Sequence, residues 1–109
     1  LDDNTAWLLS VSSAQNSNAN PEFFFNDDKT ILRTNQIGNK TECALLEMAY
    51  DLGYNYKELR NKENIVKVFP FSSETKCMTT VSKEKGKFYA FTKGAPDFVL
   101  KRCTSFINA

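Results

Sequence analysis

Residues 88–97 read FYAFTKGAPD, an apolar run that leads into a lysine, a glycine and a proline. The apolar part is typical of a β-strand. The glycine and the proline predict that this strand ends there and that a short helix follows over residues 98–103. Lys93 stands beside a glycine that allows another backbone or a ligand to approach closely, so it is a reasonable contact for an anion or a nucleotide. A solvated lysine in a strand-to-helix turn explains the same residues, because short motifs often match by chance.

Two further strands are predicted before this run. Residues 77–81 (CMTTV) should pair with it as an antiparallel hairpin, because residues 83–87 form a charged turn with Gly86 where a positive φ is needed. Residues 65–69 (IVKVF) give another strand, which Pro70 ends. The second half of the chain therefore predicts an antiparallel sheet.

The clearest helix is predicted over residues 43–52, closed by Gly53 in a left-handed conformation. Asn39 with Glu42 three residues later resembles a capping box, and Thr41 is an alternative cap. Glu42 could simply serve this cap. The residues expected to form the buried face are Leu45, Met48, Ala49 and Leu52.

The beginning of the chain is less regular. A helix is predicted over residues 2–13, capped by one of the polar residues at its start, with a buried stripe formed by Trp7, Leu8 and Val11. Residues 16–28 are rich in asparagine and are predicted to be a polar loop, although the three phenylalanines at residues 23–25 need cover from another part of the molecule. Residues 31–36 are predicted to be a short edge strand.

This order of elements predicts an α+β fold, an antiparallel β-sheet with flanking helices, and not a doubly wound parallel sheet. We expect a single domain over residues 1–109. Residues 1–37 would hold the first helix and a variable insertion, and residues 38–109 would form the core that carries the motifs. The chain begins at Leu1, which suggests a truncated piece of a longer protein.

Composition excludes several classes of protein. A net charge of +1 in 109 residues gives no basis for a nucleic-acid binder, and no apolar run approaches the ~20 residues of a membrane helix. The chain has three cysteines and no histidine, so a zinc site and a His-based catalytic triad are not expected. Free, buried thiols in a reducing compartment fit the cysteines best. The sequence contains neither a P-loop nor a GxGxxG motif.

Three motifs occur in order: GNKTECAL at residues 38–45, FSSETKCM at residues 71–78 and KGAPD at residues 93–97. Together they resemble the nucleotide-binding (N) domain of P-type cation-transporting ATPases, and most closely the plasma-membrane type of calcium-transporting ATPase. The resemblance covers roughly residues 38–103. It implies an N-domain-like α+β fold.

From the residues alone, Phe71 after Pro70 could stack a planar ring, or it could enter the core. The resemblance implies that Phe71 stacks on adenine and that Glu42 hydrogen-bonds the adenine amino edge. It also implies that Lys76 lies near the mouth of the pocket and Lys93 deep within it. The remaining site residues that the resemblance implies are Cys77 and Met78 in the wall, Gly94 leaving space for the base, and Ala95.

The resemblance further implies ATP with Mg²⁺ as the ligand, presented to a phosphorylation domain outside this chain. The parent protein would be an ATP-hydrolysing calcium pump, whereas the isolated domain would bind nucleotide without hydrolysing it, and no catalytic residue or metal ligand is expected in the chain. The partners implied are ATP and the phosphorylation and actuator domains of the pump. Nucleic acid and direct membrane contact are not expected, and the isolated domain would be a monomer. Its location would be the cytoplasmic side of an integral protein of the plasma membrane.

Two alternatives remain open at this stage. The same domain occurs in other P-type pumps, for intracellular calcium or for sodium and potassium. A remote alternative is a non-enzymatic α+β interaction domain that uses residues 23–25. Arginine is frequent in the family at the positions of Ser73 and Thr75, and glutamate at the position of Asp97. The lower number of cations in this chain predicts weaker nucleotide binding.

Overall fold

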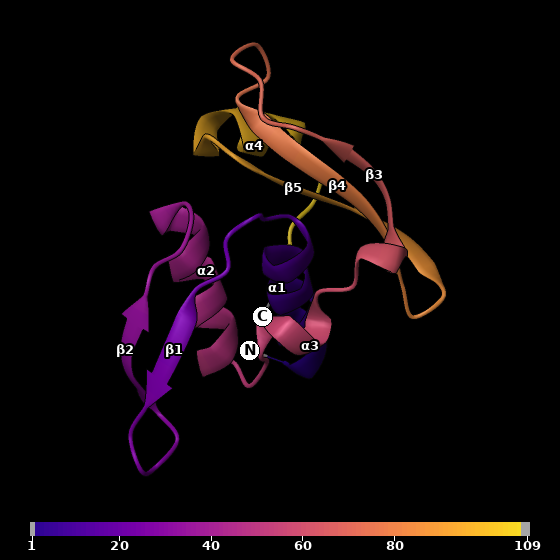
Figure 1. Ribbon diagram of the computed structural model, residues 1–109. Coiled ribbons are helices and arrows are strands. Elements are labelled where there is room, and N and C mark those ends of the chain that lie inside the picture. Colours follow the sequence, from indigo (N-terminus) through magenta and orange to yellow (C-terminus); the bar gives the residue numbers. More distant parts are fainter. Residues whose placement is uncertain (1, 108–109) are drawn as a thin grey trace.

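The computed structural model describes residues 2–107 and has two antiparallel sheets with flanking helices (Figure 1), which confirms the predicted α+β class. Its elements in chain order are α1 (Asp3–Gln15), β1 (Glu22–Phe25), β2 (Ile31–Asn35), α2 (Lys40–Asp51), α3 (Tyr56–Leu59), the 3-10 turn η1 (Lys62–Asn64), β3 (Ile65–Phe69), β4 (Cys77–Glu84), β5 (Lys87–Gly94) and α4 (Pro96–Arg102). Among these residues no helix has both the length and the apolar character needed to cross a bilayer.

The larger sheet has the strand order β3-β4-β5. The hairpin of β4 and β5 pairs without interruption from Cys77 opposite Gly94 to Glu84 opposite Lys87. Gly86 in its turn has a φ of +79°, as predicted for this position. Both strands are longer than the apolar runs that predicted them, because pairing continues through polar residues once a partner strand is in place.

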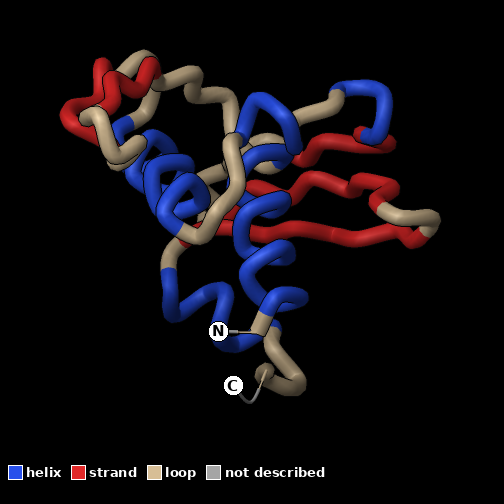
Figure 2. The backbone as a smooth tube through the Cα atoms, turned by 90° about the horizontal axis from the view of Figure 1, so that it is seen from below, coloured by secondary structure: helices blue, strands red, loops and turns tan. Residues whose placement is uncertain are grey.

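One face of this sheet packs on α1. Trp7 and Val11 of α1 form a core cluster with Phe91 of β5, and Leu8 packs against it, which confirms the predicted stripe. In Figure 2 helical coils cross in front of part of this sheet. Alternate residues of β4 point to this side and are buried, although most are polar: Met78, Thr80, Ser82 and Glu84.

Hydrogen bonds from the end of α1 satisfy these buried polar groups. Gln15 Nε2 donates to the Glu84 carboxylate at 3.0 Å. The Thr80 hydroxyl donates to Asn16 Oδ1 at 2.8 Å, and Asn16 Nδ2 donates to the Met78 carbonyl at 3.1 Å. A buried polar layer of this kind is tolerated because its donors and acceptors are paired.

The cap of α2 is the Asn39 side chain, whose Oδ1 accepts from the Glu42 backbone N–H at 3.0 Å. Gly53 follows the helix with a φ of +99°, as predicted. The predicted buried face is wrong by about one residue. Ala49 is buried as expected, but its buried companions are Cys43 and Leu46. Leucine occupies two adjacent positions, so periodicity alone could not decide which leucine faces α1.

The predicted loop over residues 16–28 is wrong in part, because β1 forms within it. β1 pairs with β2, and β2 confirms the short strand predicted at residues 31–36. Phe23 turns inward and contacts the rings of Tyr50 and Tyr56 at centroid distances of 5.8 and 6.0 Å. Three consecutive aromatic residues favour a strand once a partner is available, and this outweighs the polar composition around them.

The cysteines are free, as expected. Cys43 and Cys77 are buried, but Cys103 is exposed, which corrects the expectation that all three are buried. Cys103 follows the short helix α4, none of whose residues is buried.

Candidate functional site

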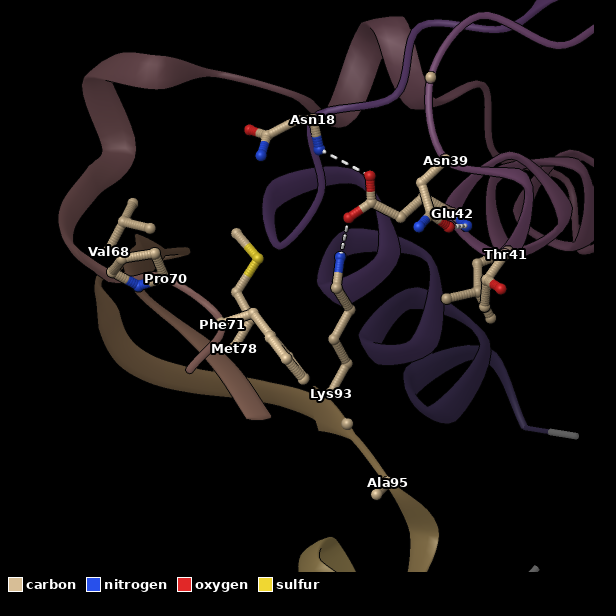
Figure 3. A pocket seen from close by; sticks show the side chains of 13 residues that line it. Asn18, Asn39, Thr41, Glu42, Val68, Pro70, Phe71, Met78, Lys93 and Ala95 are labelled. Atoms are coloured by element: carbon tan, nitrogen blue, oxygen red, sulfur yellow. Dashed lines mark hydrogen bonds and ion pairs between the residues drawn. The ribbon is translucent and has the colours of Figure 1, made fainter. Parts of the chain in front are cut away.

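A cavity of about 750 Å³ lies between the start of α2, the loop after α1 and one end of the larger sheet (Figure 3). This volume is in the range of small-molecule sites. The residues that line it come from segments distant in sequence: Asn18, Gly38, Asn39, Thr41, Glu42, Leu45, Val68, Pro70, Phe71, Met78, Lys93, Gly94 and Ala95.

One wall of the cavity is apolar. It contains Val68 of β3, then Pro70 and Phe71 directly after that strand, and Met78 from the neighbouring strand β4. Phe71 is 61% exposed, so its ring is open to a planar ligand. Pro70 follows the last residue of β3, at a position where a residue without an N–H donor is tolerated.

The opposite wall is polar and is centred on Glu42 in the first turn of α2. Glu42 Oε1 accepts from the Asn18 backbone N–H at 3.2 Å, and Oε2 forms an ion pair with Lys93 Nζ (Figure 3). Lys93 Nζ also donates to the Asn16 carbonyl. The Glu42 side chain therefore joins the loop after α1, the start of α2 and the end of β5. The cap of α2 comes from Asn39, which leaves Glu42 available for these tertiary contacts.

The loop that carries Asn18 is fixed by Arg60. The guanidinium donates to the carbonyls of Ala14 and Ala19 at 2.8 and 2.7 Å and to the Ser17 hydroxyl at 2.7 Å. Burial lowers the pKa of Arg60 from its usual value, but an arginine remains charged at neutral pH. One side chain thus fixes the loop on both sides of Asn18.

Gly94 is required by the close approach of the β4 backbone. A Cβ at this position would lie 2.2 Å from the Lys76 carbonyl oxygen and 2.8 Å from Cys77 Cα. The glycine permits the approach of another backbone, one of the two possibilities that the sequence left open. It also allows Lys93 to be placed at the cavity by the pairing of β5 with β4.

The structure brings most of the predicted site residues together at this cavity: Glu42, Phe71, Met78, Lys93, Gly94 and Ala95. Lys76 and Cys77 do not line it. Cys77 is buried and borders a separate hollow of about 510 Å³ together with Arg102. Lys76 is exposed in the loop before β4 and has a φ of +57°.

Sequence reasoning did not assign several lining residues. Asn39, Thr41 and Pro70 lie within or next to the quoted motifs, so their positions could have suggested a contact. No local signal marked Asn18, because it lies in the asparagine-rich segment and reaches the cavity only through tertiary contacts. Across residues 2–107 no three His, Cys, Asp or Glu side chains gather as a metal-binding group.

The chain is similar in sequence to a known protein family and to curated proteins. Residues 4–109 match the model of a family described as P-type ATPase, cytoplasmic domain N. The chain is 46% identical over 77 residues to plasma membrane calcium-transporting ATPase 1 of Gallus gallus, a match that covers 67% of this chain and 6% of that protein. The corresponding protein of Mus musculus is 44% identical over 77 residues, again 67% of this chain and 6% of the relative.

A more distant relative comes from Dictyostelium discoideum. Calcium-transporting ATPase PAT1 is 40% identical over 72 residues, which is 66% of this chain and 6% of the relative. The match to these curated relatives therefore spans about 6% of their length.

Proposed function

Because the chain belongs to the family of P-type ATPase cytoplasmic N domains, we propose that it binds ATP with Mg²⁺ and presents it to a phosphorylation domain of a calcium-transporting pump. This membership confirms the resemblance carried by the three motifs. The observation that supports the proposal is the cavity itself, in which the open face of Phe71 lies across from the polar wall of Glu42 and Lys93. A planar, polar-edged base fits such a pair of walls.

The base would stack on Phe71 and contact Met78, and its polar edge would face the wall that contains Glu42. One base–aromatic stack is worth about 1–3 kcal/mol. Lys93 would stay deep in the site as part of the polar wall. Lys76 does not line the cavity, and we propose that it lies beside the mouth, near the phosphates.

ATP supplies the phosphoryl group that is transferred outside this chain. The residues described here would hold the base and leave the phosphates near solvent, and Mg²⁺ would arrive with the phosphates. Weak binding of the phosphates is consistent with phosphoryl transfer outside this chain, because tighter binding of the substrate in one domain does not by itself accelerate the transfer. The isolated domain would thus bind nucleotide without hydrolysing it.

The relatives support a proposal for the wider setting of the domain. Each relative named above is a calcium-transporting ATPase, which favours calcium as the transported ion over sodium and potassium. The domain would lie on the cytoplasmic side of the plasma membrane and contact the phosphorylation and actuator domains of its pump. Residues 38–109 would form the nucleotide-binding core, and residues 1–37 would supply α1 and the β1–β2 insertion.

An amide NMR titration of the chain with ATP tests the proposal, with GTP and with Mg²⁺ alone as comparisons. We expect saturable shifts with ATP centred on the cavity, at Glu42, Phe71, Lys93 and Gly94, with a smaller shift at Lys76. GTP should give smaller shifts, and Mg²⁺ alone should give none at these residues. A folded sample whose spectrum does not change with ATP would contradict nucleotide binding.

A further inference from the structure

Asn16 caps the C-terminal end of α1, is 1% exposed, and has all of its polar groups engaged. Its backbone N–H donates to the Ser12 carbonyl at 2.9 Å. Its carboxamide is bound to β4, where Oδ1 accepts from the Thr80 hydroxyl at 2.8 Å and Nδ2 donates to the Met78 carbonyl at 3.1 Å. Its own carbonyl accepts from Lys93 Nζ. A buried residue whose donors and acceptors are all paired is held in one orientation.

Two of these partners, Met78 and Lys93, are neighbours on the larger sheet, and both line the cavity. Met78 of β4 is paired directly with Lys93 of β5, so their side chains leave the same face of the sheet. Figure 3 shows the Lys93 side chain extending to Glu42. Asn16 does not line the cavity, so it can affect a ligand only through the residues that it binds.

The position of the Lys93 ammonium depends on its acceptors. A lysine has a flexible stem and a compact charge, so it takes many positions unless acceptors fix it. The acceptors in this structure are the Glu42 carboxylate and the Asn16 carbonyl. The carboxylate belongs to a side chain that can rotate, whereas the carbonyl belongs to a backbone segment that hydrogen bonds anchor on β4. The more rigid acceptor therefore defines where the ammonium lies.

We propose that Asn16 is a positioning residue of the nucleotide site. Its carboxamide binds β4 and so holds its own carbonyl where that carbonyl fixes Lys93 in the polar wall. Groups fixed in advance bind a ligand more tightly, because less conformational freedom is lost on binding. The inference rests on the nucleotide binding proposed above, and it keeps the contacts of Glu42 and Lys93 with the ligand as proposed there.

The test compares Asn16→Ala with Gln15→Ala, which removes the neighbouring buried amide. Gln15 Nε2 donates to the Asn61 carbonyl and to the Glu84 carboxylate, both at 3.0 Å, and neither partner lines the cavity. Both variants should lose stability, because each leaves buried groups unpaired. In calorimetry with ATP, Asn16→Ala should lose about tenfold in affinity, roughly the value of one hydrogen bond. Gln15→Ala should keep the native affinity.

The Lys93 ammonium gives a second readout, which a general loss of stability would not change. Its nitrogen NMR signal is identified by its absence in Lys93→Met. A hydrogen-bonded ammonium exchanges its protons slowly with water, so the native chain should show this signal. We expect the signal to shift or disappear in Asn16→Ala and to keep its native position in Gln15→Ala.

Thr80→Val tests the same contact if Asn16→Ala does not fold. Valine keeps the shape of the side chain and removes the hydroxyl that donates to Asn16 Oδ1. We expect a loss of about threefold in ATP affinity, since one of the two carboxamide hydrogen bonds remains, together with a changed Lys93 signal. Thr80→Ser, which keeps the hydroxyl, should restore both native values.

The outcomes separate the two proposals. If a folded Asn16→Ala binds ATP with native affinity or keeps the native Lys93 signal, the positioning role is overturned while nucleotide binding stands. An equal loss of affinity in Gln15→Ala overturns it as well, and so does native affinity in Thr80→Val where Asn16→Ala does not fold. If the native chain does not bind ATP, the proposed function itself fails, and the positioning role fails with it.

Discussion

The two walls of the cavity differ in how they are joined to the rest of the fold. Glu42 and Lys93 in the polar wall are 13% and 29% exposed, and they connect the loop after α1, α2 and β5. Phe71 in the apolar wall is 61% exposed and belongs to neither of the two core clusters. The polar wall is therefore part of the folded framework, whereas Phe71 has its apolar face open to solvent or to a ligand.

This difference predicts that the two walls respond differently to mutation. Changes in the polar wall should lower both the stability of the domain and its affinity for nucleotide. Changes at Phe71 should lower affinity alone. Phe71→Ala and Lys93→Met test this distinction directly, and Gly94→Ala and Lys76→Ala give the largest and the smallest expected effects beside them.

Gly94→Ala should have the largest effect. Its Cβ would lie 2.2 Å from a backbone oxygen of Lys76, so β4 and β5 would have to move apart. We expect a loss of about 3 kcal/mol in the free energy of unfolding, at the upper end of the usual cost of overpacking. Urea denaturation followed by fluorescence measures this loss.

Gly53→Ala is the comparison for this prediction. Gly53 has open space around it but a φ of +99°, so alanine there should cost only about 1–2 kcal/mol, through backbone strain. If Gly94→Ala is as stable as the native chain, the close approach of the strands does not require glycine.

Phe71→Ala should weaken ATP binding by about 1–3 kcal/mol, the usual value of one base–aromatic stack. The stability of the domain should change by less than about 0.5 kcal/mol, as for other surface substitutions. Phe88→Ala removes a phenylalanine that is 67% exposed at the far end of the same sheet, and it should leave ATP binding unchanged. Equal affinities of Phe71→Ala and the native chain would remove Phe71 from the site.

Lys93→Met should lower the free energy of unfolding by about 1–2 kcal/mol, because Glu42 and the Asn16 carbonyl lose a charged partner that is only partly exposed to solvent. ATP affinity should fall as well, since the polar wall loses its support. Lys87→Met, on the exposed start of the same strand, is the control and should change neither quantity. A native denaturation midpoint for Lys93→Met would show that the ion pair does not stabilise the polar wall.

Lys76→Ala should have the smallest effect. Lys76 is exposed and does not line the cavity, so its contribution to ATP binding should be below about 1 kcal/mol and should disappear at high salt. Titrations at low and high ionic strength measure it. A large loss of affinity that persists at high salt would mean that Lys76 contacts the nucleotide directly.

Short-range signals in the sequence predicted much of the fold. The Gly86 turn, the Asn39 cap and the apolar runs that predict β4 and β5 depend on neighbouring residues, so they could be identified without knowledge of the tertiary structure. The formation of β1 and the buried face of α2 depend on what packs against them, and both predictions were wrong in part. Local strand propensity and helical periodicity do not contain that information.

The residues of the candidate site also fall into two groups, those that a sequence motif contains and those that only tertiary contacts bring to the cavity. Glu42, Phe71 and Lys93 belong to motifs that the sequence displays, and the structure places them around one cavity. Asn18 reaches that cavity on a loop that distant side chains hold, among them Arg60 and Glu42. A contact made through a distant side chain leaves no pattern in its own segment.

The polar layer between α1 and β4 also limits how the helix can lie on the sheet. An apolar interface allows neighbouring registers of similar energy, whereas Gln15 and Asn16 find their partners on β4 in only one alignment. If α1 slid by one turn, these buried amides would lose their partners while its apolar residues could still find apolar neighbours. The cost of that mismatch gives α1 a single docking position on the sheet. The loop that follows α1 forms part of the cavity wall, so its position is fixed as well.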